Sequence, residues 1–201
     1  LRLPAGLPDA GRFRERRRER GVLSVDDAAS RAARPLDLRA ISRAALVTAL
    51  AVALPPVFHA VRLGPVFLPM YLPILAGAFF LPARHAALAG LAAPLLSSAL
   101  TGMPPFYPPI AFWLAGELAA AGGVASLVDA RLRPATVVSV AAGLAAARLV
   151  QAALVLATAG LVGLPPRFLT LAGFVASWPG MLLALAAVPA AVALMRKGKA
   201  R

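Results

Sequence analysis

Long apolar runs alternate with short polar or basic turns from Ile41 to Met195. The apolar residues come in continuous runs and not in the one-sided stripes of a soluble amphipathic helix. Most runs approach the roughly 20 residues that a membrane-spanning helix needs. The pattern therefore predicts an all-α integral membrane protein with six transmembrane helices, at about residues 41–57, 68–81, 86–100, 110–127, 135–159 and 169–195.

Composition supports a membrane location. Hydrophobic residues make up 60% of the chain and charged residues 14%, with a mean hydropathy of +0.79, whereas soluble domains are nearer half apolar and a quarter charged. Of the 21 Lys and Arg residues, 18 fall on one predicted side of the membrane and only Arg62 and Arg167 on the other. The positive-inside rule then predicts that both termini are cytoplasmic, which agrees with an even number of spans. The chain has no cysteine, which excludes thiol chemistry.

Charge also divides the chain into three parts. Residues 1–38 form a basic arm that includes Arg12–Arg20, residues 39–197 form the six-helix membrane domain, and residues 198–201 form a basic tail. We expect the arm to be disordered in the cytoplasm, or alternatively to lie on anionic lipid. Nucleic acid is not an expected partner of the net charge of +13, because no aromatic residues are interleaved with the arm's arginines.

Two charged residues, Glu117 and Arg148, fall deep within predicted helices. At 1.5 Å per residue, Glu117 lies about 16 Å and Arg148 about 18 Å from the outer surface. A lone ion at such a depth costs about 2.5–3.5 kcal/mol or more, so each needs a partner or an aqueous cavity. The matching depths leave two interpretations open, a structural ion pair or side chains that face a ligand. Trp113, Gln151 and Trp178 are predicted at similar depths and could complete an aromatic-lined ligand site.

The loop 101–109 contains four prolines and two aromatic residues, so little entropy is lost when it becomes ordered. We expect it to form part of a lid over the ligand site, through Thr101, Met103, Phe106 and Tyr107.

The first helix carries Ala45, Ala49 and Ala53 at a spacing of four, which places them on one face. Small residues allow close helix contacts in lipid. The face could therefore pack within the bundle or dock a partner.

Other chemistries lack their motifs. No clustered His and carboxylates suggest a metal site, and no Ser–His or paired-Asp arrangement falls within the spans. The phosphate-binding pattern GxxxxGK[ST] does not occur, so the chain cannot hydrolyse ATP through a P-loop. The sequence therefore predicts neither an enzyme nor a cofactor or metal.

Three segments resemble the substrate-binding S components of energy-coupling-factor (ECF) vitamin transporters. They read LPMYLPILAGAFFLPARHAALAGLAAPLLSSALTGMPP, AARLV around Arg148, and SWPGMLLALAAVPAAVALMRK, within about residues 41–197. The resemblance implies a high-affinity binding subunit for a vitamin or related micronutrient in the bacterial plasma membrane. It also implies six helices, a ligand site in the outer half and extracellular loops that close it.

The resemblance further implies partners: a transmembrane T component, which contacts the Ala45 and Ala49 face, and two ATPases that supply the energy. Tyr71 stands where the family pattern PM-x-LP has His, and we include it in the ligand site. Two other functions are alternatives: a membrane structural or assembly subunit without a ligand, and a lipid-modifying enzyme. The enzyme would need an acidic metal motif that the sequence lacks.

Overall fold

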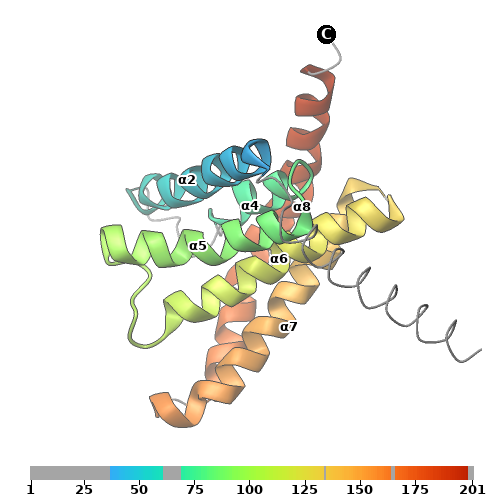
Figure 1. The fold of residues 1–201 in the computed structure, drawn as a ribbon. Coiled ribbons are helices and arrows are strands. Elements are labelled where there is room, and N and C mark those ends of the chain that lie inside the picture. The colour runs from blue at the N-terminus through green and yellow to red at the C-terminus, as the bar shows by residue number, and fades with distance from the viewer. Residues whose placement is uncertain (1–36, 61–68, 134, 164–165, 199–201) are drawn as a thin grey trace, which may run out of the picture. The chain divides into compact units, whose positions relative to one another are not determined.

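Six α-helices make up most of what the computed structural model describes, namely residues 37–60, 69–133, 135–163 and 166–198. In chain order they are α2 (Leu38–Ala60), α4 (Tyr71–Ala78), α5 (Ala83–Thr101), α6 (Ile110–Leu132), α7 (Thr136–Val162) and α8 (Pro166–Gly198) (Figure 1). Among these residues there is no strand, so the predicted all-α class and its six helices are confirmed. The predicted arm lies outside the described residues apart from its last two positions.

Four of these helices, α2, α6, α7 and α8, are long and apolar enough to cross a membrane. With eight residues, α4 rises only about 12 Å, far less than the roughly 30 Å of a hydrocarbon core. Large apolar side chains are nevertheless exposed along α5 as along the longer helices, including Leu46, Leu100, Leu149 and Leu194. A soluble monomer rarely exposes so much apolar surface. These features indicate a membrane protein, with four helices that fit as spans.

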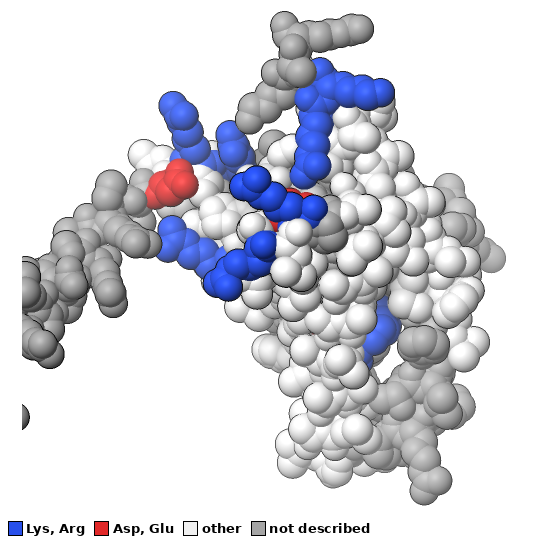
Figure 2. Space-filling view, turned by 90° about the vertical axis from the view of Figure 1, so that its right-hand side faces the viewer, with Lys and Arg blue, Asp and Glu red and all other residues white. Residues whose placement is uncertain are grey.

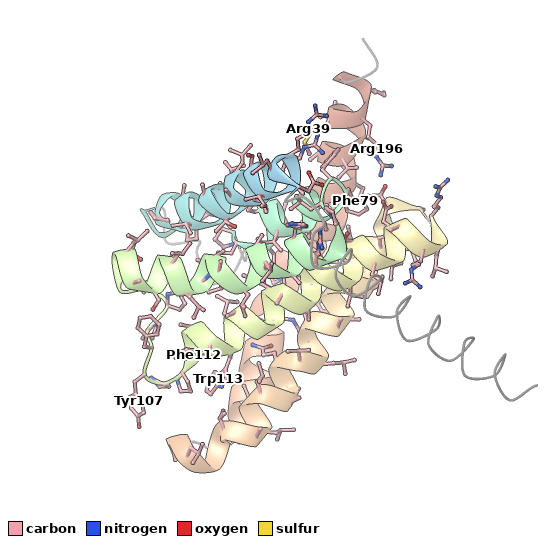
Figure 3. All side chains as sticks on the ribbon, in the orientation of Figure 1. Arg39, Phe79, Tyr107, Phe112, Trp113 and Arg196 are labelled. Atoms are coloured by element: carbon pink, nitrogen blue, oxygen red, sulfur yellow. The ribbon has the colours of Figure 1, made fainter. Side chains whose placement is uncertain are left out.

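One end of the bundle collects the positive charge (Figure 2). Arg196, near the end of α8, lies 3.6 Å from Asp129 near the end of α6 and 5.9 Å from the ring centroid of Phe79, which follows α4. Arg39, at the start of α2, is close by, whereas Tyr107 lies at the far end (Figure 3). We call this the basic end. Arg39 and Arg196 lie there (Figure 3), and we include the basic residues at the helix ends that meet there, namely Arg84, Arg131, Arg133 and Lys197.

Consecutive helices therefore run in opposite directions relative to the basic end. Helices α4, α6 and α8 finish there, α5 and α7 begin just after those ends, and α2 starts there (Figures 1 and 3). The start of α2 and the end of α8 thus lie on the same side of the bundle. Neither terminus is among the described residues, so the cytoplasmic position of both stays a prediction.

Helix α6 is the centre of the packing, because the backbones of α5 and α7 both touch it. A Cβ atom added to Gly90 of α5 would lie 2.3 Å from the carbonyl oxygen of Leu118, and one added to Gly143 of α7 would lie 2.6 Å from that of Ala121. Only residues without side chains allow such an approach. The turn before α5 is tied to α6 as well, since Ser126 Oγ donates to the Leu81 carbonyl at 2.7 Å.

The predicted small-residue face of the first helix is not part of this packing. Ala45, Ala49 and Ala53 are all exposed, whereas α2 turns Ala51 and Val47 towards the core. Val47 contacts α4 at Gly77. The structure therefore does not use this face for packing within the described bundle, and docking of a partner stays a prediction.

The short helix α4 is buried among its neighbours. It packs against α2, α5, α6 and α8, and its residues Tyr71, Ile74 and Leu75 are among the most completely buried side chains. Tyr71 is the first residue of α4, and the packing of this helix against its neighbours, α6 among them, holds the phenol ring inside the bundle.

The Gly90 contact makes a testable prediction. Gly90→Ala should lower the free energy of unfolding by about 1–3 kcal/mol, because the added methyl group meets backbone atoms that cannot move aside. Gly116→Ala is the matched control, since its methyl group would meet mainly the flexible tip of Leu154 at 2.6 Å. Thermal unfolding of the purified protein in detergent measures both. Equal melting temperatures for Gly90→Ala and wild type would contradict the contact.

Candidate functional site

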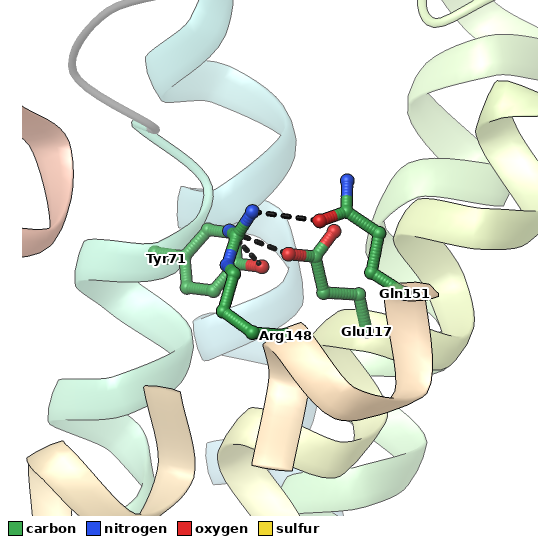
Figure 4. Close-up of polar contacts among 4 residues, drawn as sticks. All are labelled: Tyr71, Glu117, Arg148 and Gln151. Carbon is green, nitrogen blue, oxygen red and sulfur yellow. Dashed lines mark hydrogen bonds and ion pairs between the residues drawn. The ribbon is translucent and has the colours of Figure 1, made fainter. Parts of the chain in front are cut away.

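Four polar side chains from three helices meet inside the bundle (Figure 4). Tyr71 comes from α4, Glu117 from α6, and Arg148 and Gln151 from α7. Arg148 joins them: Nη2 lies 2.5 Å from Glu117 Oε1 and donates to the Tyr71 hydroxyl at 3.0 Å, while Nη1 donates to Gln151 Oε1 at 2.8 Å. We call these four residues the polar cluster.

Packing explains why the four side chains meet. Gly143 lets the α7 backbone approach α6, and Arg148 follows about one turn further along α7. Gln151 is three residues beyond Arg148, so both lie on neighbouring positions of one helix face. Glu117 precedes Leu118, whose carbonyl is the contact point for α5. The same close approach of α5, α6 and α7 therefore brings the polar cluster together.

The polar cluster is almost completely buried. Glu117 is 2% exposed and Tyr71 1%, and the side chain of Arg148 is 12% exposed. The guanidinium carbon of Arg148 lies 5.6 Å from the Tyr71 ring centroid. The paired charges offset the cost that either ion alone would have in an apolar interior. The structural pair that the matching depths allowed is thus present.

Two atoms of the pair keep unused hydrogen-bonding capacity. Arg148 Nε is buried without a hydrogen-bond partner, and Glu117 Oε1, despite its contact with Nη2, accepts no hydrogen bond of good geometry. A guanidinium has five donor hydrogens and a carboxylate oxygen has two lone pairs. The polar cluster therefore keeps one donor and one acceptor whose hydrogen-bonding capacity is not used within the described residues. No group of three or more His, Cys, Asp or Glu side chains is found among the described residues.

Trp113 lies one turn from Glu117 on α6 and is buried. Its Nε1 donates to Thr158 Oγ1 at 2.9 Å, and Thr158 donates in turn to the Leu154 carbonyl at 2.8 Å. The indole thus continues the polar contact between α6 and α7 beyond the polar cluster. Thr158 was not among the predicted site residues, although its position seven residues after Gln151 places it two turns away on the same face of α7.

The start of the loop 101–109 is tied to α5. Ser97 Oγ donates to the Met103 carbonyl at 2.8 Å, Ser98 Oγ donates to the Pro104 carbonyl at 2.5 Å, and Thr101 Oγ1 donates to the Ser97 carbonyl at 2.7 Å. Gly102 turns the chain with φ = 75°, a conformation that favours glycine. Neither serine was singled out from the sequence, although their hydroxyls fix the course of the loop.

The predicted lid residues are open to the surroundings. Thr101, Met103 and Phe106 are exposed, Tyr107 is 77% exposed, and the ring of Phe106 lies 5.7 Å from that of Phe112. Thr101 and Met103 are tied to α5 and Phe106 contacts Phe112, and no contact described here joins these side chains to the polar cluster. Trp178 on α8 is 54% exposed, so it does not line a buried site in this conformation. Their role in ligand binding stays a prediction.

Comparisons with models of protein families, with curated proteins and with solved structures gave no match to this chain. The resemblance to ECF S components therefore stays a prediction from the sequence.

The geometry predicts how the ion pair contributes to stability. Glu117→Gln and Arg148→Gln should each cost about 3–5 kcal/mol, because each leaves one buried charge without its partner. The double variant should recover most of that loss. Chemical or thermal unfolding in detergent measures all three.

Tyr71→Phe is the control, because it keeps both charges and removes only one hydroxyl. Its expected cost is smaller, about 1–3 kcal/mol. A Glu117→Gln variant as stable as wild type would mean that the pair does not hold α6 and α7 together.

Proposed function

We propose that this chain is the membrane-embedded, high-affinity binding subunit for a vitamin or related micronutrient, that is, the S component of an ECF-type importer in a bacterial plasma membrane. A T component and two ATPases would supply the coupling and the energy, and this chain would not itself be an enzyme. The observation that carries the proposal is the buried polar cluster of Tyr71, Glu117, Arg148 and Gln151 inside a bundle of apolar helices. The proposal includes six membrane helices, of which α4 is too short to cross the membrane by itself, and both termini in the cytoplasm. The positive charge gathered at the basic end supports this orientation.

Energetics favour a ligand for the polar cluster. A buried ion pair is seldom better for stability than well-packed apolar side chains of the same size. Ionisable residues within membrane helices more often belong to substrate or ion pathways. A few polar groups that converge among apolar side chains are typical of a small-molecule site.

The surroundings of the polar cluster suggest how a ligand would be enclosed. Trp113 extends the site from Glu117 towards the end with the loop 101–109. Met103, Phe106 and Tyr107 lie at that end with exposed side chains, and we propose that they close over the ligand. Trp178 would join them if α8 turns inward.

A structural or assembly subunit without a ligand is the second candidate. It is favoured by one observation, namely that Glu117 and Arg148 are already paired with each other. In that case the polar cluster would only fix the positions of α4, α6 and α7.

Ligand release separates the two functions. Mass spectrometry of material released from the purified, denatured protein should find a bound small organic molecule, and calorimetry should show that it binds again tightly. The folded double variant Glu117→Gln with Arg148→Gln should bind it about ten- to a hundredfold more weakly, the effect of one lost charge-assisted hydrogen bond. Wild-type affinity in that variant would move both residues out of the site, and a protein that retains and binds nothing would favour the structural subunit.

The exposed face of α2 gives a second test. Ala49→Leu should reduce co-purification with the T component and ATPases, because a bulky side chain prevents close helix contact, while ligand binding stays unchanged. Ala145→Leu on α7 is the matched control, since it makes the same change at another exposed position. If Ala49→Leu assembles as well as the control, this face is not the docking surface.

A further inference from the structure

The polar cluster has no net charge. It combines one carboxylate and one guanidinium with a phenol and an amide, and Glu117 is the only acid buried among the described residues. The other buried polar residues of the described core are serines, so no additional charge is available there to balance a charged ligand group. Any group that binds must therefore leave this balance intact or create a buried net charge.

The unused atoms of the pair are one donor and one acceptor. Arg148 Nε can donate a hydrogen bond, and Glu117 Oε1 can accept one. Both belong to side chains that are already in contact through Nη2. In Figure 4 the amide nitrogen of Gln151 points away from Arg148, so it is a further donor in the same region.

We infer that the end of the ligand that reaches the polar cluster is uncharged and carries adjoining N–H and C=O groups, as in a carboxamide, a lactam or a ureide. The C=O would accept from Arg148 Nε, and the N–H would donate to Glu117 Oε1. This inference rests on the proposed binding function and names the chemical class for the same site.

Charged ligand groups fit the arrangement less well. A carboxylate would need Arg148, whose Nη2 is 2.5 Å from Glu117 and also bound to Tyr71, and would give the buried cluster a net negative charge. A zwitterion would keep the balance but would have to separate the pair. An amide-type group can bind while the pair stays intact.

Matched probes test the inference on the full-length protein in lipid nanodiscs at pH 7. Two pairs of compounds serve as probes. Nicotinate has a carboxylate where nicotinamide has a carboxamide, and orotate has a carboxylate where uracil has a ring hydrogen. Calorimetry with these four compounds should show the uncharged member of a pair binding at least about tenfold more tightly. The ligand released from the protein should itself contain an amide, lactam or ureide.

Two variants link the preference to the charge of the polar cluster. Glu117→Gln gives the polar cluster a net positive charge. This variant should therefore reduce or reverse the ratio of affinities that favours the uncharged probe over the anionic one. If that variant does not fold, Gln151→Glu keeps the ion pair, adds a negative charge and should widen the preference about tenfold.

The outcomes separate this inference from the proposed function. Tighter binding of the anionic member, a released ligand without an amide-type group, or a probe preference that neither variant changes overturns the inference and leaves the binding function standing. If the protein releases no small molecule and binds none of the four probes, both fall. A released ligand of the amide class supports the inference even if none of the four probes binds.

Discussion

The contact between Arg148 and Glu117 is the interaction on which the inner part of the bundle depends. Its two charges come from α7 and α6, and Tyr71 adds α4 through the same guanidinium. Neither charge is stable in an apolar interior without the other. The three helices must therefore stay close enough for a hydrogen bond, which is possible because Gly90 and Gly143 let α5 and α7 approach the α6 backbone.

Hydrophobic pattern and turn chemistry predicted the helices well. The described α6 begins at Ile110, as expected after a loop with four prolines, and α5 and α7 lie close to their predicted ranges. The second helix is shorter than predicted, Tyr71–Ala78 in place of about 68–81, because turns flank it on both sides. The apolar run continues through those turns, so hydropathy alone could not show where the helix ends.

The candidate site was predicted in part. Depth along the helices brought Glu117 and Arg148 to the same level, but depth does not show which way a side chain faces. The hydrogen bonds of Tyr71 and Thr158 depend on the rotation of α4 and α7 about their axes. In an alanine-rich chain small residues occur on every helix face. The sequence pattern therefore could not show that the helices approach closely at Gly90 and Gly143 and not along the exposed face of Ala45, Ala49 and Ala53.

The neutrality of the polar cluster also determines how the cluster responds to a membrane potential. Moving one elementary charge through a potential of 100 mV involves about 2.3 kcal/mol. Because Glu117 and Arg148 form a pair with no net charge, the transmembrane voltage would do almost no work on them if α4, α6 and α7 shifted together along the membrane normal. An uncharged ligand carried with them would be equally insensitive to voltage. Under the proposed binding function, the membrane potential would therefore contribute nothing to moving such a ligand across the bilayer.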